Sequence, residues 1–354
     1  MSQFHSLPRA ADSAIIPEMK TLTWNPALRG RSLLTMNSFS DAEMLELIDL
    51  AADLKARRAA GIRGNILARR NIALIFEKHS TRTRNSSAIA ARDEGGNTEY
   101  LSSSEIHLGV KESVEDTAKV LGRLFDGILF RGFKQSTVET LARDSGVPVW
   151  NGLTDFCHPT QILADLLTVR ERYGKLRGIR VAYVGDGRNN VANSLMVGCA
   201  KAGVDYVNCT PPELMPDEAL VESARQIAAR NGSTVTVAND PKKGVEGAHV
   251  LYTDVWVSMG EEDKKAERLR LLSPYQVNMD LMKATGRPLD ELTFLHCLPA
   301  FHDNQTEVSK DSGALEVTDE VFRSPCSRVF DEAENRMHTI KALFVSSLGD
   351  PSQA

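Results

Sequence analysis

The residues best suited to chemistry lie between Phe76 and Ser86, where the sequence reads FEKHSTRTRNS. Three hydroxyl groups and two guanidinium groups gather in this segment, at Ser80, Thr81, Arg82, Thr83 and Arg84. We expect them to precede a helix at Asn85–Glu94, whose free N–H groups and dipole attract anions. A guanidinium group can donate two parallel hydrogen bonds to two oxygens of one phosphate. A solvated capping turn is the simpler alternative, but this combination of side chains favours a phosphate site.

Two further candidates are a basic residue and a histidine near predicted strand ends. Arg131 ends the apolar run Gly127–Phe130, and ligands of α/β proteins bind beyond the carboxyl ends of strands. His158-Pro159-Thr160-Gln161 begins a helical pattern. A histidine at a helix start can donate a hydrogen bond to a carbonyl oxygen, and Gln161 lies one turn further on the same face. A surface salt bridge for Arg131 and a structural helix cap for His158 are the alternatives.

A glycine-containing segment, GDGRNNVANS, spans Gly185–Ser194 and follows an apolar run. It is similar to the start of a dinucleotide-binding motif, but Asn190 stands where the third glycine belongs. No acidic residue ends the next predicted strand, so the segment disfavours a nicotinamide cofactor. The neutral amides of Asn189 and Asn190 are instead suited to the carboxylate of a small ligand.

An acidic residue and a cysteine follow two other apolar runs. Asp254 places an anion at a predicted strand end, where it suits a cationic amine. Cys297 directly follows His296, but adjacent strand residues point to opposite faces, so these two cannot form a nucleophile–base pair. A buried, unreactive thiol is therefore the default interpretation of Cys297.

The elements that position these residues are short apolar runs, most of them followed by polar loops and helical patterns. The predicted strands are Ile72–Phe76, Gly127–Phe130, Val147–Trp150, Val181–Val184, Val235–Val237, Val250–Tyr252 and Phe294–Leu298. This alternation predicts an α/β protein with two doubly wound parallel-sheet domains, joined by a helix at Pro159–Tyr173. We expect a leader at 1–30, a first domain at 31–157 and a second domain at 158–330. A C-terminal helix at 331–348 is expected to pack back on the first domain.

Composition excludes several classes of protein. The chain has 354 residues, of which 42% are hydrophobic, and a net charge of −5, which indicates folded domains and no nucleic-acid partner. No apolar stretch approaches the roughly 18–20 residues of a membrane span. The leader lacks the features of a secretion signal, and the five scattered cysteines indicate no disulfide framework or zinc site. We expect a soluble cytoplasmic protein with a poorly ordered leader.

Taken in order, these motifs resemble those of the aspartate/ornithine carbamoyltransferase family, and within it the ornithine enzymes of the bacterial anabolic type. The resemblance rests on Ser80–Arg84, Arg131, His158–Gln161, Asp254 with Ser258-Met259-Gly260, His296–Pro299 and Asp331–Ala342. It implies transfer of the carbamoyl group of carbamoyl phosphate to the δ-amine of L-ornithine, which gives L-citrulline and phosphate. It also implies a place in arginine biosynthesis, and neither a metal nor an organic cofactor.

The resemblance further implies a carbamoyl phosphate-binding domain at 31–157, an ornithine-binding domain at 158–330, and roles for individual residues. Carbamoyl phosphate would be held by Ser80, Thr81, Arg82, Thr83, Arg131, His158, Gln161, Cys297, Leu298 and Arg336. Ornithine would be held by Asn190, Asp254, Ser258 and Met259. Arg131, His158 and Cys297 would act in the transfer itself, by direct attack through a tetrahedral intermediate. The family assembles as a homotrimer with sites at subunit boundaries, so His107 and Lys111 would reach the neighbouring subunit's carbamoyl phosphate.

Several alternatives stay open at this point. One alternative within the family is a transferase whose acceptor is putrescine or N-acetylornithine, which Ser258-Met259-Gly260 disfavours. Another is an aspartate carbamoyltransferase, which would show an HPLPR-type loop at 296–300, where this sequence reads HCLPA. An NAD-dependent dehydrogenase is an alternative from another class, and a catalytically inactive relative is a third. The sequence does not indicate whether trimers assemble further, or in which direction the reaction runs in the cell.

Overall fold

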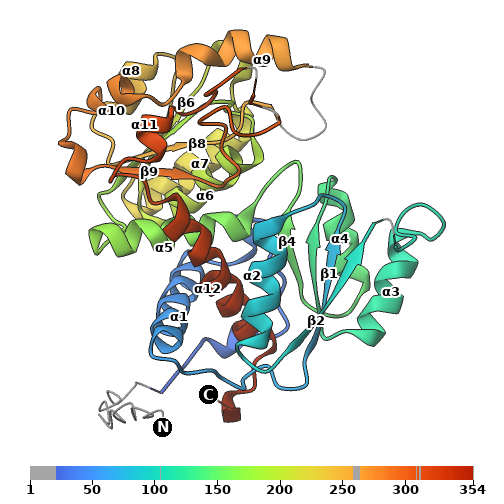
Figure 1. Ribbon diagram of the computed structural model, residues 1–354. Coiled ribbons are helices and arrows are strands. Elements are labelled where there is room, and N and C mark those ends of the chain that lie inside the picture. Colours follow the sequence, from blue (N-terminus) through green and yellow to red (C-terminus); the bar gives the residue numbers. More distant parts are fainter. Residues whose placement is uncertain (1–20, 104, 258–263, 308, 311, 354) are drawn as a thin grey trace, which may run out of the picture.

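The computed structural model describes residues 21–103, 105–257, 264–307, 309–310 and 312–353. Two parallel β-sheets, each covered by helices, form two lobes (Figure 1). Two long helices, α5 (Pro159–Tyr173) and α12 (Val329–Leu348), lie where the lobes meet. The prediction of an α/β protein with two doubly wound parallel sheets joined by a helix is confirmed.

The first sheet contains four parallel strands in the spatial order β2-β1-β3-β4. The strands are β1 (Asn71–Phe76), β2 (Asn97–Ser102), β3 (Gly127–Arg131) and β4 (Val149–Leu153). The helices of this lobe are α1 (Asp41–Ala59), α2 (Thr81–Arg92), α3 (Val114–Leu124) and α4 (Gln135–Asp144). The central strands β1 and β3 are buried and apolar, whereas β2 lies at the sheet edge and is mostly polar, so no apolar run marks it in the sequence.

The second sheet contains five parallel strands in the order β7-β6-β5-β8-β9. The strands are β5 (Arg180–Val184), β6 (Asp205–Cys209), β7 (Val235–Ala238), β8 (Val250–Thr253) and β9 (Thr293–His296). The helices are α6 (Asn190–Ala202), α7 (Glu218–Asn231), α8 (Pro241–Val245), α9 (Lys265–Leu272), α10 (Met279–Lys283) and α11 (Asp319–Phe322). The strand order reverses between β1 and β3 and again between β5 and β8, and such reversals are where α/β sheets bind ligands.

Part of the predicted leader belongs to the folded chain. Leu22 and Leu28 are 4% and 1% exposed and join the main apolar core. The backbone N–H of Gly30 donates a hydrogen bond to the carbonyl oxygen of Ser347 at 2.9 Å. The prediction of a poorly ordered leader is therefore wrong for residues 21–30, and residues 1–20 lie outside the described ranges.

Helix α12 returns the end of the chain to the first lobe (Figure 1). It packs against α1, α2 and α5, and Ile340, Leu343 and Phe344 on it are fully buried in the apolar core. The helix thus contacts the first lobe, as the sequence predicts for residues 331–348. The exact domain boundaries and the assignment of one substrate to each domain stay predictions. None of the helices in the described ranges is long and apolar enough to cross a membrane.

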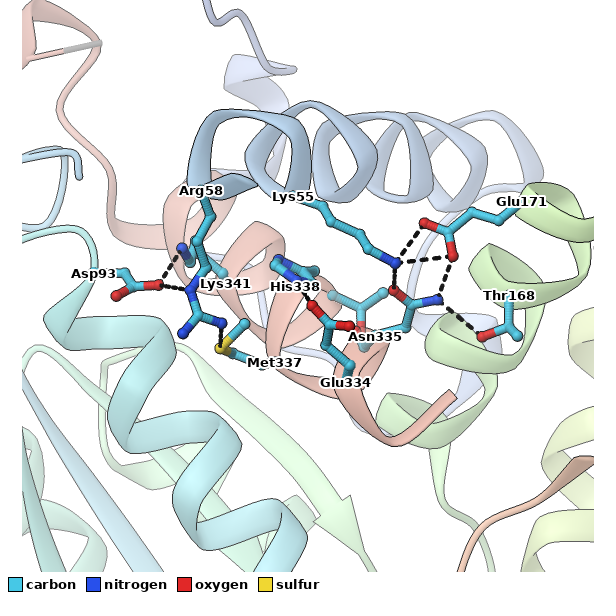
Figure 2. Close-up of polar contacts among 11 residues, drawn as sticks. Lys55, Arg58, Asp93, Thr168, Glu171, Glu334, Asn335, Met337, His338 and Lys341 are labelled. Atoms are coloured by element: carbon cyan, nitrogen blue, oxygen red, sulfur yellow. Dashed lines mark hydrogen bonds and ion pairs between the residues drawn. The ribbon is translucent and has the colours of Figure 1, made fainter. Parts of the chain in front are cut away.

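Buried charges join α12 to α1 and α2 at one end of the helix (Figure 2). The carboxylate of Asp93, just after α2, lies 2.8 Å from Nζ of Lys341 and 3.1 Å from Nε of Arg58. Arg63 pairs with the other oxygen of the same carboxylate at 3.1 Å. The ammonium group of Lys341 also lies 3.8 Å from Glu94. The buried ammonium group of Lys341 and the partly exposed guanidinium groups of Arg58 and Arg63 thus all face a carboxylate of the protein itself.

A second set of contacts joins the same helix to α1 and α5 (Figure 2). Asn335 accepts a hydrogen bond from Lys55 at 2.8 Å and donates to Thr168 and Glu171 at 2.9 and 2.8 Å. His338 lies between the two sets, and its Nε2 is 3.3 Å from a carboxylate oxygen of Glu334. We call the contacts from Asp93 to Glu171 the α12 polar network. It fixes α12 against three helices.

Candidate active site

A cavity of about 160 Å³ lies between the lobes, at the carboxyl ends of strands from both sheets. Its charged and polar lining residues are Lys78, Ser80, Arg82, Thr83, Arg131, His158, Asn189, Asn190, Asp254, Cys297 and Arg336. The cavity lies where the reversals of strand order place a ligand. Most of the residues that the sequence singles out for chemistry therefore meet at one site.

The hydroxyl-rich segment is the first turn of α2 rather than a loop before the helix. Helix α2 begins at Thr81, and Ser80 is its N-cap, since Ser80 Oγ accepts a hydrogen bond from the backbone N–H of Thr83 at 3.1 Å. The prediction that the helix begins at Asn85 is therefore wrong by about one turn, because the hydroxyl cap acts earlier in the sequence. The free N–H groups of this first turn place partial positive charge beside the cavity.

The earlier helix start separates the two arginines of the segment. Arg82 lines the cavity and donates a hydrogen bond to the carbonyl oxygen of Leu298. Arg84 is exposed, and its guanidinium lies over the ring of Tyr100 at 3.7 Å. Residues two apart on a helix do not face the same way. The expectation that both arginines serve one phosphate is wrong for Arg84, and Thr81 is exposed and outside the cavity wall.

Three guanidinium groups meet at the cavity, on Arg82, Arg131 and Arg336. In the described part of the chain none of them forms an ion pair with a carboxylate, and Nε of both Arg131 and Arg336 is buried without a hydrogen-bond partner. Burial, and then repulsion by Arg336 and Arg82, lowers the pKa of Arg131 to about 9. Burial and repulsion by Arg82 lower the pKa of Arg336 to about 10. This unmatched positive charge strongly favours an anionic ligand.

Arg336 reaches the cavity from α12 and is held by three side chains. Its Nη2 donates to Thr83 Oγ1 at 2.9 Å, and its Nη1 lies 3.4 Å from His158 Nε2. Nη1 also donates to Gln161 Oε1. Gln161 is 1% exposed and does not line the cavity, and its predicted contact with carbamoyl phosphate stays a prediction. Gln161 positions Arg336.

His158 directly precedes α5 and lines the cavity, as the sequence predicts. Its backbone N–H donates a hydrogen bond to Ser194 Oγ at 2.8 Å, which fixes the start of the helix. Burial, and then the positive charges of Arg336 and Arg131, lowers the pKa of His158 well below its usual value. The imidazole is therefore neutral at physiological pH and can donate a hydrogen bond without adding positive charge.

The second lobe contributes a carboxylate and a thiol. Asp254, just after β8, accepts hydrogen bonds from Cys297 Sγ and from Asn189 Nδ2, both at 3.0 Å. Burial and the charge of Asp254 raise the pKa of Cys297 well above its usual value, so the thiol stays protonated. The ring of His296 lies instead 3.2 Å from Glu316. Cys297 is thus a hydrogen-bond donor to Asp254 and not half of a Cys–His pair.

Leu298 supplies backbone groups to the same wall. Strand β9 ends at His296, so Cys297 and Leu298 lie beyond the strand that the sequence predicts to continue through them. Leu298 has a φ of 57°, a left-handed conformation that costs a leucine on the order of 1–3 kcal/mol. This conformation is held by the hydrogen bond from Arg82 to its carbonyl and by one from its N–H to His296 Nδ1 at 2.9 Å.

The remaining predicted residues have different placements. Ser258 and Met259 lie outside the described residues. His107 and Lys111 are exposed on the loop between β2 and α3 and do not line the cavity of their own chain. Asn190 lines the cavity, where its Nδ2 donates to the carbonyl oxygen of Thr154 at 2.7 Å.

Lys78 is a cavity residue that the sequence reasoning missed. Its side chain is 8% exposed, and its Nζ lies 2.6 Å from a carboxylate oxygen of Asp155 and 4.3 Å from the ring centre of Phe133. Its position could have revealed it, because Lys78 lies two residues after β1 and ligands of α/β proteins bind beyond the carboxyl ends of strands.

Two groups in the described residues bring three potential metal ligands within 4.8 Å of one another. One contains Asp254, His296 and Cys297, but both ring nitrogens of His296 already have partners in Leu298 and Glu316. The second consists of His302, Asp303 and Asp319, where Arg323 pairs with both carboxylates at 3.5 and 2.8 Å. Neither group has a free set of ligand atoms, so we assign no metal to either.

Comparison with known proteins gives consistent matches over almost the whole described chain. Residues 31–171 match the family model "Aspartate/ornithine carbamoyltransferase, carbamoyl-P binding domain", and residues 177–347 match "Aspartate/ornithine carbamoyltransferase, Asp/Orn binding domain". The chain is 59% identical to "Ornithine carbamoyltransferase, catabolic" of Bacillus licheniformis over 329 residues, which cover 91% of this chain and 98% of the relative. It is 56% identical to the protein of the same name from Bacillus cereus, covering 93% and 99%.

A solved structure gives the same result. The ornithine carbamoyltransferase of Pyrococcus furiosus is 41% identical, with a TM-score of 0.84, and the match covers 91% of this chain and 98% of that one. The predicted resemblance to ornithine carbamoyltransferases is confirmed by these comparisons. The anabolic type is not supported, because both Bacillus relatives are named catabolic.

Proposed function

The chain belongs to the aspartate/ornithine carbamoyltransferase family, and from this premise we propose that it transfers the carbamoyl group of carbamoyl phosphate to the δ-amine of L-ornithine, giving L-citrulline and phosphate. One observation supports the proposal above all others. Three guanidinium groups that form no ion pair within the described residues line the same cavity as the Asp254 carboxylate, so the site offers cations to a phosphate and an anion to an ammonium group.

Carbamoyl phosphate fits the wall formed by α2 and the arginines. In the proposed complex the phosphate lies at the first turn of α2, where Ser80, Thr83 and Arg82 face the cavity. Arg336 supplies a second fork from α12. Binding of the dianion would satisfy the guanidinium nitrogens that lack partners in the unliganded chain. This neutralises the leaving group and fixes its orientation.

The transfer itself requires an uncharged amine, whereas an alkyl ammonium group has a pKa near 10. Asp254, which already accepts a hydrogen bond from the thiol of Cys297, is placed to accept another from the amine and so orient its lone pair. Attack builds negative charge on the carbonyl oxygen, and Arg131 and the neutral His158 are the donors for that oxyanion. Phosphate then leaves directly, so no covalent enzyme intermediate forms.

Activity assays test the acceptor. Purified enzyme is incubated with carbamoyl phosphate and, side by side, with ornithine, putrescine, N-acetylornithine and aspartate. We expect product with ornithine and at least tenfold lower rates with the others, since Asp254 suits a cationic δ-ammonium group while a second site must hold the α-carboxylate. Preference for putrescine or N-acetylornithine would overturn the choice of acceptor. The dehydrogenase alternative is excluded by the family match of both halves of the chain.

We assign the reaction to the catabolic direction in the cell, in place of the predicted role in arginine biosynthesis. The support is the word catabolic in the names of the 59% and 56% identical Bacillus relatives. In that direction citrulline and phosphate are consumed and carbamoyl phosphate and ornithine are formed. Deleting the gene in its host should cause citrulline to accumulate during growth on arginine, without creating a requirement for arginine. An arginine requirement would instead support the anabolic role.

A homotrimer in which His107 and Lys111 complete the neighbouring subunit's site also remains a proposal. Its support is an apolar surface around this loop, where Val110, Val120 and Leu124 are 83%, 49% and 65% exposed. Mixing subunits tests it: Arg82→Ala and Lys111→Ala chains should each be impaired alone, yet regain activity after they are mixed and reassembled. No gain would show that both residues act within one chain. Cytoplasmic location stays a prediction, which cell fractionation tests.

A further inference from the structure

Two carboxylates lie buried directly behind the cavity, Asp165 on α5 and Glu332 on α12, which are 1% and 0% exposed. Both accept hydrogen bonds from the same amide, since Gln161 Nε2 lies 2.8 Å from Asp165 Oδ1 and 2.7 Å from Glu332 Oε1. Within the described ranges no lysine or arginine forms an ion pair with either carboxylate. Such a buried acidic pair is costly, so its contacts deserve a functional explanation.

Glu332 contacts the second lobe through two different strands. Its Oε2 accepts a hydrogen bond from the backbone N–H of His296 at 2.9 Å, at the residue before Cys297. Its Oε1 accepts from the hydroxyl of Tyr252 at 3.1 Å, two residues before Asp254. The carboxylate therefore holds the ends of β9 and β8, the two strand ends that carry the thiol and the carboxylate of the cavity.

The same carboxylate is linked to the arginine wall through one side chain. Gln161 donates to Glu332 with its Nε2 and accepts from Arg336 with its Oε1. Arg336 continues the chain of contacts to Thr83 on α2, at 2.9 Å. Both ends of the Gln161 amide are thus engaged, and it cannot turn without breaking a contact. A continuous chain of contacts therefore runs from Arg336 through Gln161 and Glu332 to β8 and β9.

The charge of the pair supports this arrangement. Burial raises the pKa of Asp165 to about 7, and burial together with Asp165 raises the pKa of Glu332 well above its usual value. Two neighbouring buried carboxylates do not both ionise, so the pair retains a proton near neutral pH. Glu332 accepts three hydrogen bonds while Asp165 Oδ2 has no partner among the described residues, which places the functional contacts on Glu332.

We propose that Glu332 is a positioning residue that couples the two substrate sites, because it joins the arginine facing carbamoyl phosphate to the strand ends facing ornithine. The inference rests on the proposed function. When the phosphate draws Arg336 into place, Gln161 and Glu332 bring the ends of β8 and β9 into the arrangement that ornithine requires. Ornithine should consequently bind well only after carbamoyl phosphate, and this dependence should require the Glu332 carboxylate.

Calorimetry measures the coupling directly. Ornithine is titrated into the full-length enzyme with and without a saturating, unreactive phosphonate analogue of carbamoyl phosphate, and the ratio of the two dissociation constants is the coupling factor. We expect a factor of at least about tenfold in the wild type and below about threefold in Glu332→Gln. The glutamine has the same shape, but its NH₂ accepts no hydrogen bond, so either His296 on one side or Tyr252 and Gln161 on the other must lose their acceptor.

A matched control lies on the same helix. Glu334→Gln removes a carboxylate that is 53% exposed, contacts His338 and lies away from the cavity, so its coupling factor should equal that of the wild type. A purely structural role for Glu332 would weaken binding of both ligands and lower the melting temperature, but would leave the coupling factor unchanged. If Glu332→Gln does not fold, Gln161→Ala breaks the same link and should show the same loss of coupling.

The outcomes separate the two proposals. Citrulline formation by the wild type tests the function, and its absence defeats that function and the inference together. An active wild type with a coupling factor near one, or a Glu332→Gln enzyme that retains the wild-type factor, overturns the role of Glu332 alone. A loss of coupling in Glu332→Gln and Gln161→Ala, with none in Glu334→Gln, supports it.

Discussion

The cavity and the α12 polar network are both buried and charged, but their charges are arranged in opposite ways. In the network, Lys341 and Arg58 both face the carboxylate of Asp93 (Figure 2). In the cavity, Arg131 is only 8% exposed, and the described residues offer its guanidinium no carboxylate partner and no hydrogen bond to its Nε. The protein therefore matches its own charges in one place and leaves them unmatched in the other.

This difference distinguishes structural charge from binding charge. A matched buried pair contributes mainly when one partner is removed, because the other is then left alone in a low-dielectric environment. A buried cation without a carboxylate partner is already unfavourable in the folded protein because it has lost its hydration, and a bound anion reduces this free-energy cost. Helix α12 supplies both kinds, with Arg336 at the cavity and Lys341 in the network, only five residues apart. The two classes predict opposite responses to mutation.

The largest effect is expected from removing a matched charge. Asp93→Ala leaves Lys341, Arg58 and Arg63 without this carboxylate, so we expect a loss of about 3–5 kcal/mol in the free energy of unfolding. Urea denaturation measures it. The KM for carbamoyl phosphate should stay within about twofold, because the network does not line the cavity. A stable variant with impaired substrate binding would contradict the distinction.

Removing an unmatched charge should have the reverse pattern. Arg82→Ala takes a charge-assisted fork away from the phosphate, which costs about 2–4 kcal/mol, or roughly 30- to 1,000-fold in affinity for carbamoyl phosphate. Inhibition by phosphate should weaken in parallel. The free energy of unfolding should fall by no more than about 1 kcal/mol, since Arg82 has no carboxylate partner to leave unpaired and gives up one hydrogen bond to the carbonyl of Leu298. Unchanged affinity for both anions would falsify the assignment of this wall.

The third prediction concerns pH and the histidine inside the network. Burial lowers the pKa of His338 to about 4, whereas an unfolded histidine titrates near 6.5. As the pH falls from 6.5 toward 4, the unfolded chain takes up a proton that the native chain does not. The free energy of unfolding should therefore fall by up to about 3 kcal/mol over this window. His338→Gln lacks this contribution, so equal pH slopes in the two proteins would refute it.

The smallest effect should come from the thiol. Cys297→Ser retains a hydrogen-bond donor to Asp254, so we expect measurable turnover and an increase of about fivefold in the KM for ornithine, near 1 kcal/mol. Intact-mass measurement after mixing the wild type with carbamoyl phosphate alone should show no adduct. A stable mass increase that disappears in Cys297→Ser would instead establish Cys297 as a covalent nucleophile.

The sequence predicted those parts of the fold that depend on local pattern. Buried central strands such as β1 and β5 are continuous apolar runs and were predicted within one residue at each end. The edge strand β2 has no such run, and its extended conformation is recognised only from its pairing with β1. The sequence predicts the start of α2 one turn too late, because the polar residues that follow the Ser80 cap are equally typical of a loop.

Errors at the site follow from the same cause. If the helix is predicted to begin at Asn85, Arg82 and Arg84 both lie before it and cannot be distinguished, although only Arg82 lines the cavity. The contact between Gln161 and Glu332 could not be predicted, because the two residues are 171 apart in sequence and no local pattern reveals it. Lys78 was missed because a single lysine after a strand is as typical of a solvated surface as of a ligand site.

The return of α12 to the first lobe has a consequence for how the protein is made. A ribosome adds about 5–20 residues per second, so the stretch from the end of α5 to the end of α12 takes roughly 10–35 s to synthesise. Throughout that interval, the surfaces of α1 and α2 that α12 later covers are exposed on the nascent chain. The first lobe is completed only after the second has been synthesised, so a chaperone that shields α1 and α2 has its opportunity in this interval.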